Sequence, residues 1–173
     1  MNNSKKVAFC GVISCISTLC MFLTSIIPIG TFALPAIASV FILFTVIETD
    51  KKWAFMTLTS TTVLSLLFAQ DKEAVIIFIM FFGPYSIIKL FIENINNKYI
   101  QYILKFGFFN ISIILYFFAS IYILMIPSDS FTIFGVYLPG VFLAIANIFF
   151  ILYDYSLTLL IIRYITQRRY KHK

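Results

Sequence analysis

Long apolar runs, separated by short stretches that carry charges or prolines, fill most of the chain. A bilayer core needs about 20 apolar residues per helix, with some variation for tilt. The breaks define six candidate spans, at residues 7–27, 31–48, 53–69, 74–92, 103–126 and 136–164. The pattern predicts an all-α integral membrane protein whose six transmembrane helices form one bundle over residues 1–166. A basic cytoplasmic tail, residues 167–173, is expected to follow.

Composition supports a membrane protein and argues against a soluble one. Hydrophobic residues make up 61% of the chain, and only 12% of the residues are charged. A soluble domain carries roughly a quarter charged residues, because its surface faces water. The connections between the apolar runs are short, so they leave no room for a separate soluble domain.

Lysines and arginines set the expected orientation, because they collect on the cytoplasmic side of a membrane. Of the 13 lysines and arginines, only Lys72 falls on the outer side if the N-terminus is inside. This distribution needs an even number of spans. The chain is therefore expected in the cell membrane, with both termini on the cytoplasmic side. The net charge of +6 then reflects this bias and the attraction of the basic tail to anionic lipid, without any nucleic-acid partner.

The sequence does not place cysteines, histidines or acidic residues where a metal site or a Ser-His-Asp triad would need them. Cys10, Cys15 and Cys20 are five residues apart, which places successive side chains about 140° apart on a helix. His172 is the single histidine and lies in the basic tail. We therefore expect no metal site, no cofactor and no catalytic residues.

Several polar residues nevertheless lie within the later spans. Lys89 and Glu93 are one helical turn apart and can face the same way. With both ends inside, Asn110 lies in the inner half of its span, and Asp154 lies about 13 Å above Arg163. Lys89 can then reach towards Asp154 while Glu93 pairs with Arg163. One intramembrane polar cluster of Lys89, Glu93, Asn110, Asp154 and Arg163 is therefore predicted. The alternative is that Lys89 and Glu93 only anchor the helix at the interface, with the lysine reaching the headgroups.

Small residues recur along the first span, at Ala8, Gly11, Ser14 and Cys15. Small side chains let helices approach closely in lipid, where there is no hydrophobic drive for association. Two interpretations remain open. The residues pack within the bundle, or they dock the chain onto a separate membrane partner.

A small, basic, six-span chain with small residues along its first span and no phosphate-binding loop resembles the substrate-binding S components of energy-coupling-factor vitamin transporters. The resemblance implies capture of a vitamin or similar small-molecule solute. It also implies a transmembrane coupling protein with cytosolic ATPases as partner, docked at the first span. Family members hold their ligand in the outer half, which makes Asn147, Tyr137 and Tyr122 the ligand-binding candidates here.

Two other classes of protein are alternatives to a transporter subunit. A cell-envelope scaffold, similar to the small multi-span rod-shape-determining membrane proteins, fits the size and the charge distribution about as well. An intramembrane enzyme would need a carboxylate pair, a histidine or a metal set within the membrane, and only Asp154 qualifies. The chain is therefore not expected to be an enzyme.

Overall fold

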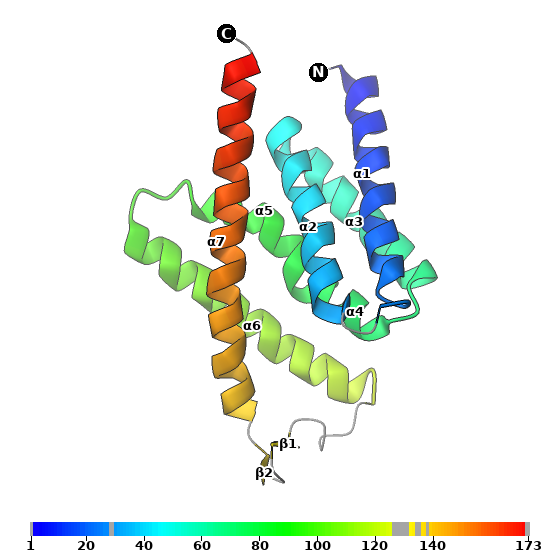
Figure 1. The fold of residues 1–173 in the computed structure, drawn as a ribbon, viewed down its shortest axis with the longest axis vertical. Helices are drawn as coiled ribbons and strands as arrows, with labels where there is room; N and C mark the ends of the chain where they lie inside the picture. Colours follow the sequence, from blue (N-terminus) through cyan, green and yellow to red (C-terminus); the bar gives the residue numbers. More distant parts are fainter. Residues whose placement is uncertain (1, 28–29, 126–131, 134–135, 138, 172–173) are drawn as a thin grey trace. The chain divides into compact units, whose positions relative to one another are not determined.

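The computed structural model describes residues 2–27, 30–125, 132–133, 136–137 and 139–171, and nearly all of them are helical (Figure 1). The elements are α1 (Asn3–Leu23), α2 (Gly30–Glu48), α3 (Lys51–Phe68), α4 (Lys72–Ile77), the π-helix η1 (Phe78–Phe82), α5 (Gly83–Ile92), α6 (Lys98–Tyr122), β1 (Thr132–Ile133), β2 (Val136–Tyr137) and α7 (Pro139–Lys171). The predicted all-α class is confirmed, with one two-residue antiparallel β-ladder as a minor addition.

Five helical segments of the described residues are long and apolar enough to cross a membrane. They are Asn3–Leu23, Gly30–Glu48, Lys72–Ile92, Lys98–Tyr122 and Gly140–Gln167, which supports a multi-pass membrane protein. The predicted span at residues 53–69 also forms a helix, α3, but it begins with two lysines and carries a run of threonines and serines. These residues make α3 less apolar than the other five, so the count of six spans stays a prediction.

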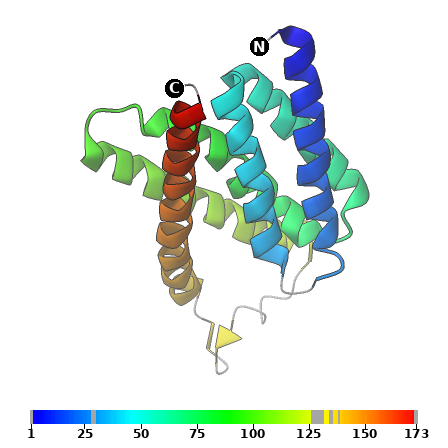
Figure 2. The ribbon, with the colours of Figure 1, turned by 45° about the horizontal axis from the view of Figure 1, so that its top comes forward.

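The chain divides into two compact units, residues 1–127 and residues 128–173, and each is described by itself. In the first unit α1 packs mainly against α2 and α3, and α2 also contacts α5. Figures 1 and 2 both show α1 and α2 side by side along their lengths. The core of this unit includes the fully buried Met21, Ile42, Ala54 and Phe78. The predicted single domain is not tested by this division.

The fourth expected span is one continuous helical segment with a π-helical turn in its middle. Pro84 in this segment has no backbone N–H to donate. The helix widens just before it, over Phe78–Phe82, and the N–H of Gly83 donates to the carbonyl of Phe78, five residues back. A β-carbon at Gly83 would collide with the Leu58 side chain of α3. The glycine therefore allows α3 to approach this turn closely.

Aromatic side chains join this segment to α6. The Phe81 ring lies 5.2 Å from the Tyr85 ring and 5.1 Å from the Phe109 ring, centroid to centroid. Tyr85 also stacks on Phe108 at 6.1 Å. Such offset and edge-on pairs each add to the stability that burial provides. They hold the polar residues of α5 next to α6.

The second unit contains the β1–β2 pair and α7. In the β-ladder Thr132 lies opposite Tyr137 and Ile133 opposite Val136. Helix α7 has 33 residues, which corresponds to about 50 Å and exceeds the thickness of a bilayer core. The sixth span was expected from residue 136, but the helix begins only at Pro139, because proline suits the first turn of a helix and residues 136–137 are in β2.

Candidate functional site

The best-defined polar site of the first unit is an ion-pair cluster of Lys89, Glu93 and Lys105. The ammonium of Lys89 lies 2.7 Å from Oε1 of Glu93, one helical turn further along α5. Lys105 reaches the same oxygen from α6, at 2.8 Å. The Lys89 side chain is fully buried, while that of Glu93 is 26% exposed. One carboxylate oxygen therefore holds two ammonium groups from two helices.

The connection between α5 and α6 is fixed by side-chain hydrogen bonds. The Gln101 amide donates to the backbone carbonyl of Ile95 at 2.6 Å and to that of Glu93 at 3.3 Å. The Asn97 side chain caps the start of α6 by accepting from the N–H of Tyr99 at 3.0 Å. These bonds satisfy backbone groups that a helix end leaves open. They also set where α6 begins, and hence where Lys105 points.

The structure brings two of the predicted cluster residues, Lys89 and Glu93, into direct contact. Asn110 lies five residues beyond Lys105 on α6, and its amide donates to the Phe106 carbonyl at 2.8 Å. Asp154 and Arg163 lie on α7, in the second unit. Their part in the cluster therefore stays a prediction.

Within α7, Asp154 is half-buried. It lies on the helix face that also carries the buried side chains of Phe150, Leu157 and Ile161, while Arg163 is exposed.

Sequence analysis missed Lys105 as a member of the cluster. It counted this lysine only as a charge on the cytoplasmic side. The available signal was its position at the start of an apolar run, where a lysine has to find either headgroups or an acidic partner.

The three predicted ligand-binding residues are distributed over both units. Tyr122 is the last residue of α6 and is 76% exposed. Tyr137 lies on β2, paired with Thr132. Asn147 is half-buried on α7, and its amide donates to the Leu143 carbonyl at 2.8 Å. Their convergence on one ligand stays a prediction.

The predicted docking residues divide between two faces of α1. Ala8, Gly11 and Cys15 are exposed, whereas Ser14 is buried. A β-carbon at Gly11 would meet no atom within 4 Å. Residues 8, 11 and 15 follow the three-and-four spacing of one helix face. They form an exposed small-residue strip, hereafter the α1 strip.

A second polar group, hereafter the Asp71–Glu73 cluster, lies at the start of α4 and consists of Ser25, Thr31, Asp71, Glu73 and Tyr116. The Thr31 hydroxyl donates to Asp71 Oδ2 at 3.0 Å, and the Tyr116 hydroxyl donates to the Glu73 carboxylate. Ser25 accepts from the N–H of Gln70 at 3.0 Å. The cluster thus connects the α1–α2 segment, α4 and α6. Sequence analysis did not predict it, because no spacing rule relates Tyr116 to Glu73.

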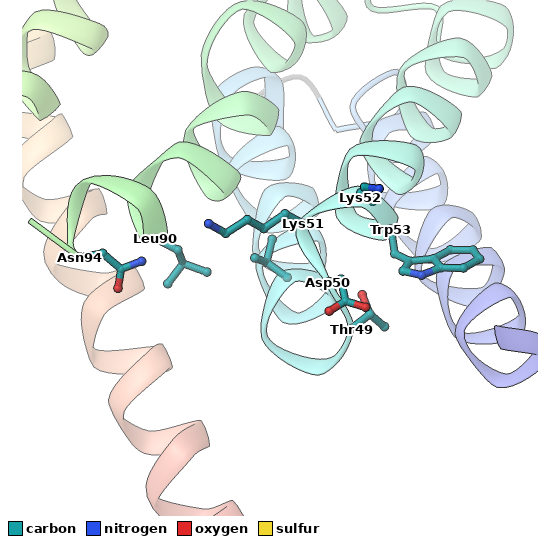
Figure 3. A pocket seen from close by; sticks show the side chains of 8 residues that line it. Thr49, Asp50, Lys51, Lys52, Trp53, Leu90 and Asn94 are labelled. Carbon is teal, nitrogen blue, oxygen red and sulfur yellow. The ribbon is translucent and has the colours of Figure 1, made fainter. Parts of the chain in front are cut away.

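A hollow of about 580 Å³ opens where α2 ends, α3 begins and α5 ends. Figure 3 shows Lys51 extending from α3 towards Leu90 and Asn94. The ammonium of Lys51 also lies 3.6 Å from the centre of the Phe91 ring. The full lining consists of Val46, Thr49, Asp50, Lys51, Lys52, Trp53, Leu90 and Asn94.

The Asp50 carboxylate at the rim of the hollow is paired with Lys6 of α1. The hydrogen bond from the Lys6 ammonium, and then its charge, hold the pKa of Asp50 below its ordinary value. Because it faces Lys6, the Asp50 side chain forms no cap bond to α3, although its backbone has the extended conformation of an N-cap residue.

Within the described residues, no group of three or more His, Cys, Asp or Glu side chains could hold a metal ion. The two clusters described above are held together by ion pairs and hydrogen bonds. No family model matches this chain, and no curated protein and no solved structure matches it either.

Proposed function

We propose that the chain is a membrane-embedded solute-binding subunit of an uptake transporter for a vitamin or similar small molecule. In this proposal it has six spans with both termini in the cytoplasm, and a transmembrane coupling protein with cytosolic ATPases provides the energy. The observation that carries the proposal is the α1 strip, which leaves small residues facing outwards where a membrane partner could pack.

The α1 strip has the properties that a helix-docking surface in lipid requires. Ala8, Gly11 and Cys15 let a second backbone approach closely, and close packing is the main source of helix association in a bilayer. Larger side chains, Val12 at 57% exposure and Leu19 at 62%, lie beside them. A partner helix that packs on the strip would contact both the small residues and these apolar neighbours.

The dimensions of α3 support a sixth span. Its 18 residues correspond to about 27 Å, close to the roughly 30 Å of a bilayer core. Lys51 and Lys52 would then lie at the headgroup level, where lysines are favoured. The crossings of α1 and α2 place Lys51 and Lys52 on the same side as Lys5 and Lys6, and a crossing of α3 would leave Lys72 on the other side, as in the predicted orientation.

The Asp71–Glu73 cluster supports a polar solute site at the opposite end of the helices. It joins the α1–α2 segment to α6, and the Phe32 and Tyr116 rings form a T-shaped pair with their centroids 6.4 Å apart. Both segments belong to the region where the resembling family holds its ligand. In the proposed orientation this end of the first unit faces outwards, towards the incoming solute.

Purification from cells that carry the natural partners tests the proposal. We expect the tagged chain to retain a small molecule, detectable by mass spectrometry of a solvent extract, and to co-purify with a membrane protein and ATPases. Gly11→Leu should abolish the co-purification, because it fills the α1 strip, while the small molecule is retained. Gly107→Leu is the matched control, since a β-carbon at Gly107 in α6 also meets no atom within 4 Å.

A different pattern would contradict transport. If extracts from several growth media contain no small molecule and the chain co-purifies with cell-wall or division proteins, the scaffold function is favoured. If Gly11→Leu and Gly107→Leu have the same effect on the partner, the α1 strip is not the docking surface.

A further inference from the structure

Positive charge accumulates in the hollow at the start of α3. Lys51 and Lys52 line it, and its acidic lining residue, Asp50, is already in an ion pair with Lys6. Helix α3 has no acidic residue in its first turn, so the positive end of its dipole adds to the two ammonium charges. This concentration of charge costs stability, and a bound anion would offset it.

Apolar surface continues from the hollow along α3. Phe55 and Met56 follow Lys51 and Lys52 by four residues, so each lies on the same helix face as one of the lysines. They are 63% and 57% exposed. Phe91, whose ring faces the Lys51 ammonium, is 45% exposed. The surface therefore changes from cationic to apolar within one helical turn.

We propose that this hollow binds an anionic phospholipid. Its phosphate oxygens would accept hydrogen bonds from the Lys51 ammonium, which extends towards Asn94 (Figure 3). Lys52, which also lines the hollow, would add positive charge. The acyl chains would lie along Phe55 and Met56. Charge complementarity selects an anionic headgroup, and the adjoining apolar surface selects a lipid over a soluble phosphate. The inference goes beyond the proposed function, because such a lipid is bound whether or not the chain carries a solute.

Native mass spectrometry of the full chain in a neutral detergent tests this site. The wild-type protein receives equal amounts of phosphatidylglycerol and phosphatidylcholine with identical acyl chains, and we expect it to retain the anionic lipid preferentially. Lys51→Gln with Lys52→Gln should weaken phosphatidylglycerol binding about 30-fold. Lys5→Gln with Lys98→Gln is the matched control, because it removes the same charge from two exposed lysines outside the hollow and should leave binding unchanged.

A second variant keeps the test decisive if the double variant does not fold. Asn94→Asp places a negative charge in the hollow at an exposed position without changing the size of the side chain, and it should also weaken phosphatidylglycerol binding. Equal retention of the two lipids by the wild-type protein would overturn the proposal, as would an equal loss in the control. Displacement of phosphatidylglycerol by millimolar inorganic phosphate would also overturn it, in favour of a soluble phosphate ligand.

Discussion

The ammonium of Lys105 lies 2.8 Å from Oε1 of Glu93, and this contact joins α5 to α6 across the turn between them. Lys89 lies 2.7 Å from the same oxygen and is fully buried. A buried ammonium without a charged partner lowers the stability of the fold. Glu93 therefore stabilises the buried charge of Lys89 and also joins α5 to α6. The first prediction follows from this arrangement.

Glu93→Gln removes the negative charge between the two lysines and is expected to destabilise the chain strongly. Loss of one member of a buried pair costs about 3–5 kcal/mol, and the lower end applies because Glu93 is 26% exposed. Unfolding by SDS in mixed micelles measures the change. Lys98→Met, at the exposed start of α6, is the control and should have little effect. Equal stability of Glu93→Gln and the wild-type chain would mean that the ion pairs are only interfacial anchors.

Gly83→Ala is expected to destabilise by about 1–3 kcal/mol, because the new methyl group collides with the Leu58 side chain. Leu58→Ala frees that space, so the double variant should lose less stability than the sum of the two single variants. The same unfolding assay measures all three. Gly107→Ala, which adds a methyl group in open surroundings, is the control. Simple additivity would contradict the close approach of α3.

Tyr116→Phe removes the hydroxyl that donates to the Glu73 carboxylate. A hydrogen bond to a charged group is worth about 1.5–3 kcal/mol, so a loss of this size in the free energy of unfolding is expected. Tyr122→Phe, at the exposed end of the same helix, should be neutral. If the two variants unfold alike, the Asp71–Glu73 cluster does not stabilise the connection between α4 and α6.

The Lys6–Asp50 pair predicts a specific dependence on pH. Because the folded-state pKa of Asp50 is lowered, the pair contributes stability above the unfolded-state pKa, and this contribution is lost as the pH falls towards the folded-state pKa. Carbon-13 NMR of labelled aspartate side chains follows the titration. Lys6→Gln should return the pKa of Asp50 towards its ordinary value, and Lys5→Gln should not. Identical titration in both variants would show that Lys6 is not the partner.

The number of spans can be decided at the two ends of α3. Thr49→Cys and Gln70→Cys place thiols just before and just after this helix. We expect an impermeant maleimide added outside intact cells to label residue 70 but to label residue 49 only after permeabilisation. The unmodified chain, with Cys10, Cys15 and Cys20 in α1, is the control. Labelling of both positions from the same side would mean that α3 does not cross.

Hydropathy located the apolar helices well but not their ends. The fifth span was expected over residues 103–126, yet α6 begins at Lys98, because Asn97 caps it and the polar residues of its first turn are compatible with a helix. Apolarity marks the part of a helix that suits lipid, whereas caps mark where the helix begins and ends. Helix α1 likewise begins at Asn3 and not at residue 7, because the polar residues of its first turn are compatible with a helix, although Asn2 forms no side-chain cap bond.

Local spacing indicates which side chains share a helix face, but it carries no information on contacts between helices. The separation of four residues was enough to place Lys89 and Glu93 on one face, where the structure shows them in contact. The contact of Lys105 with Glu93 depends on the turn between α5 and α6, which Gln101 and Asn97 fix. The hydrogen bond from Tyr116 to Glu73 depends on how α6 packs on α4. Both contacts arise from tertiary packing, for which the periodicity of a single helix carries no signal.

The π-helical turn at Phe78–Phe82 determines in which direction, about the helix axis, the later side chains of the same membrane segment point. Relative to an uninterrupted α-helix, a widened turn accommodates an extra residue without the usual rotation of about 100°. Deleting a single residue there would restore regular α-helical winding and rotate Lys89 and Glu93 together by about 100° about the helix axis, away from Lys105. One local irregularity in helical winding thus governs which side chains meet at its far end.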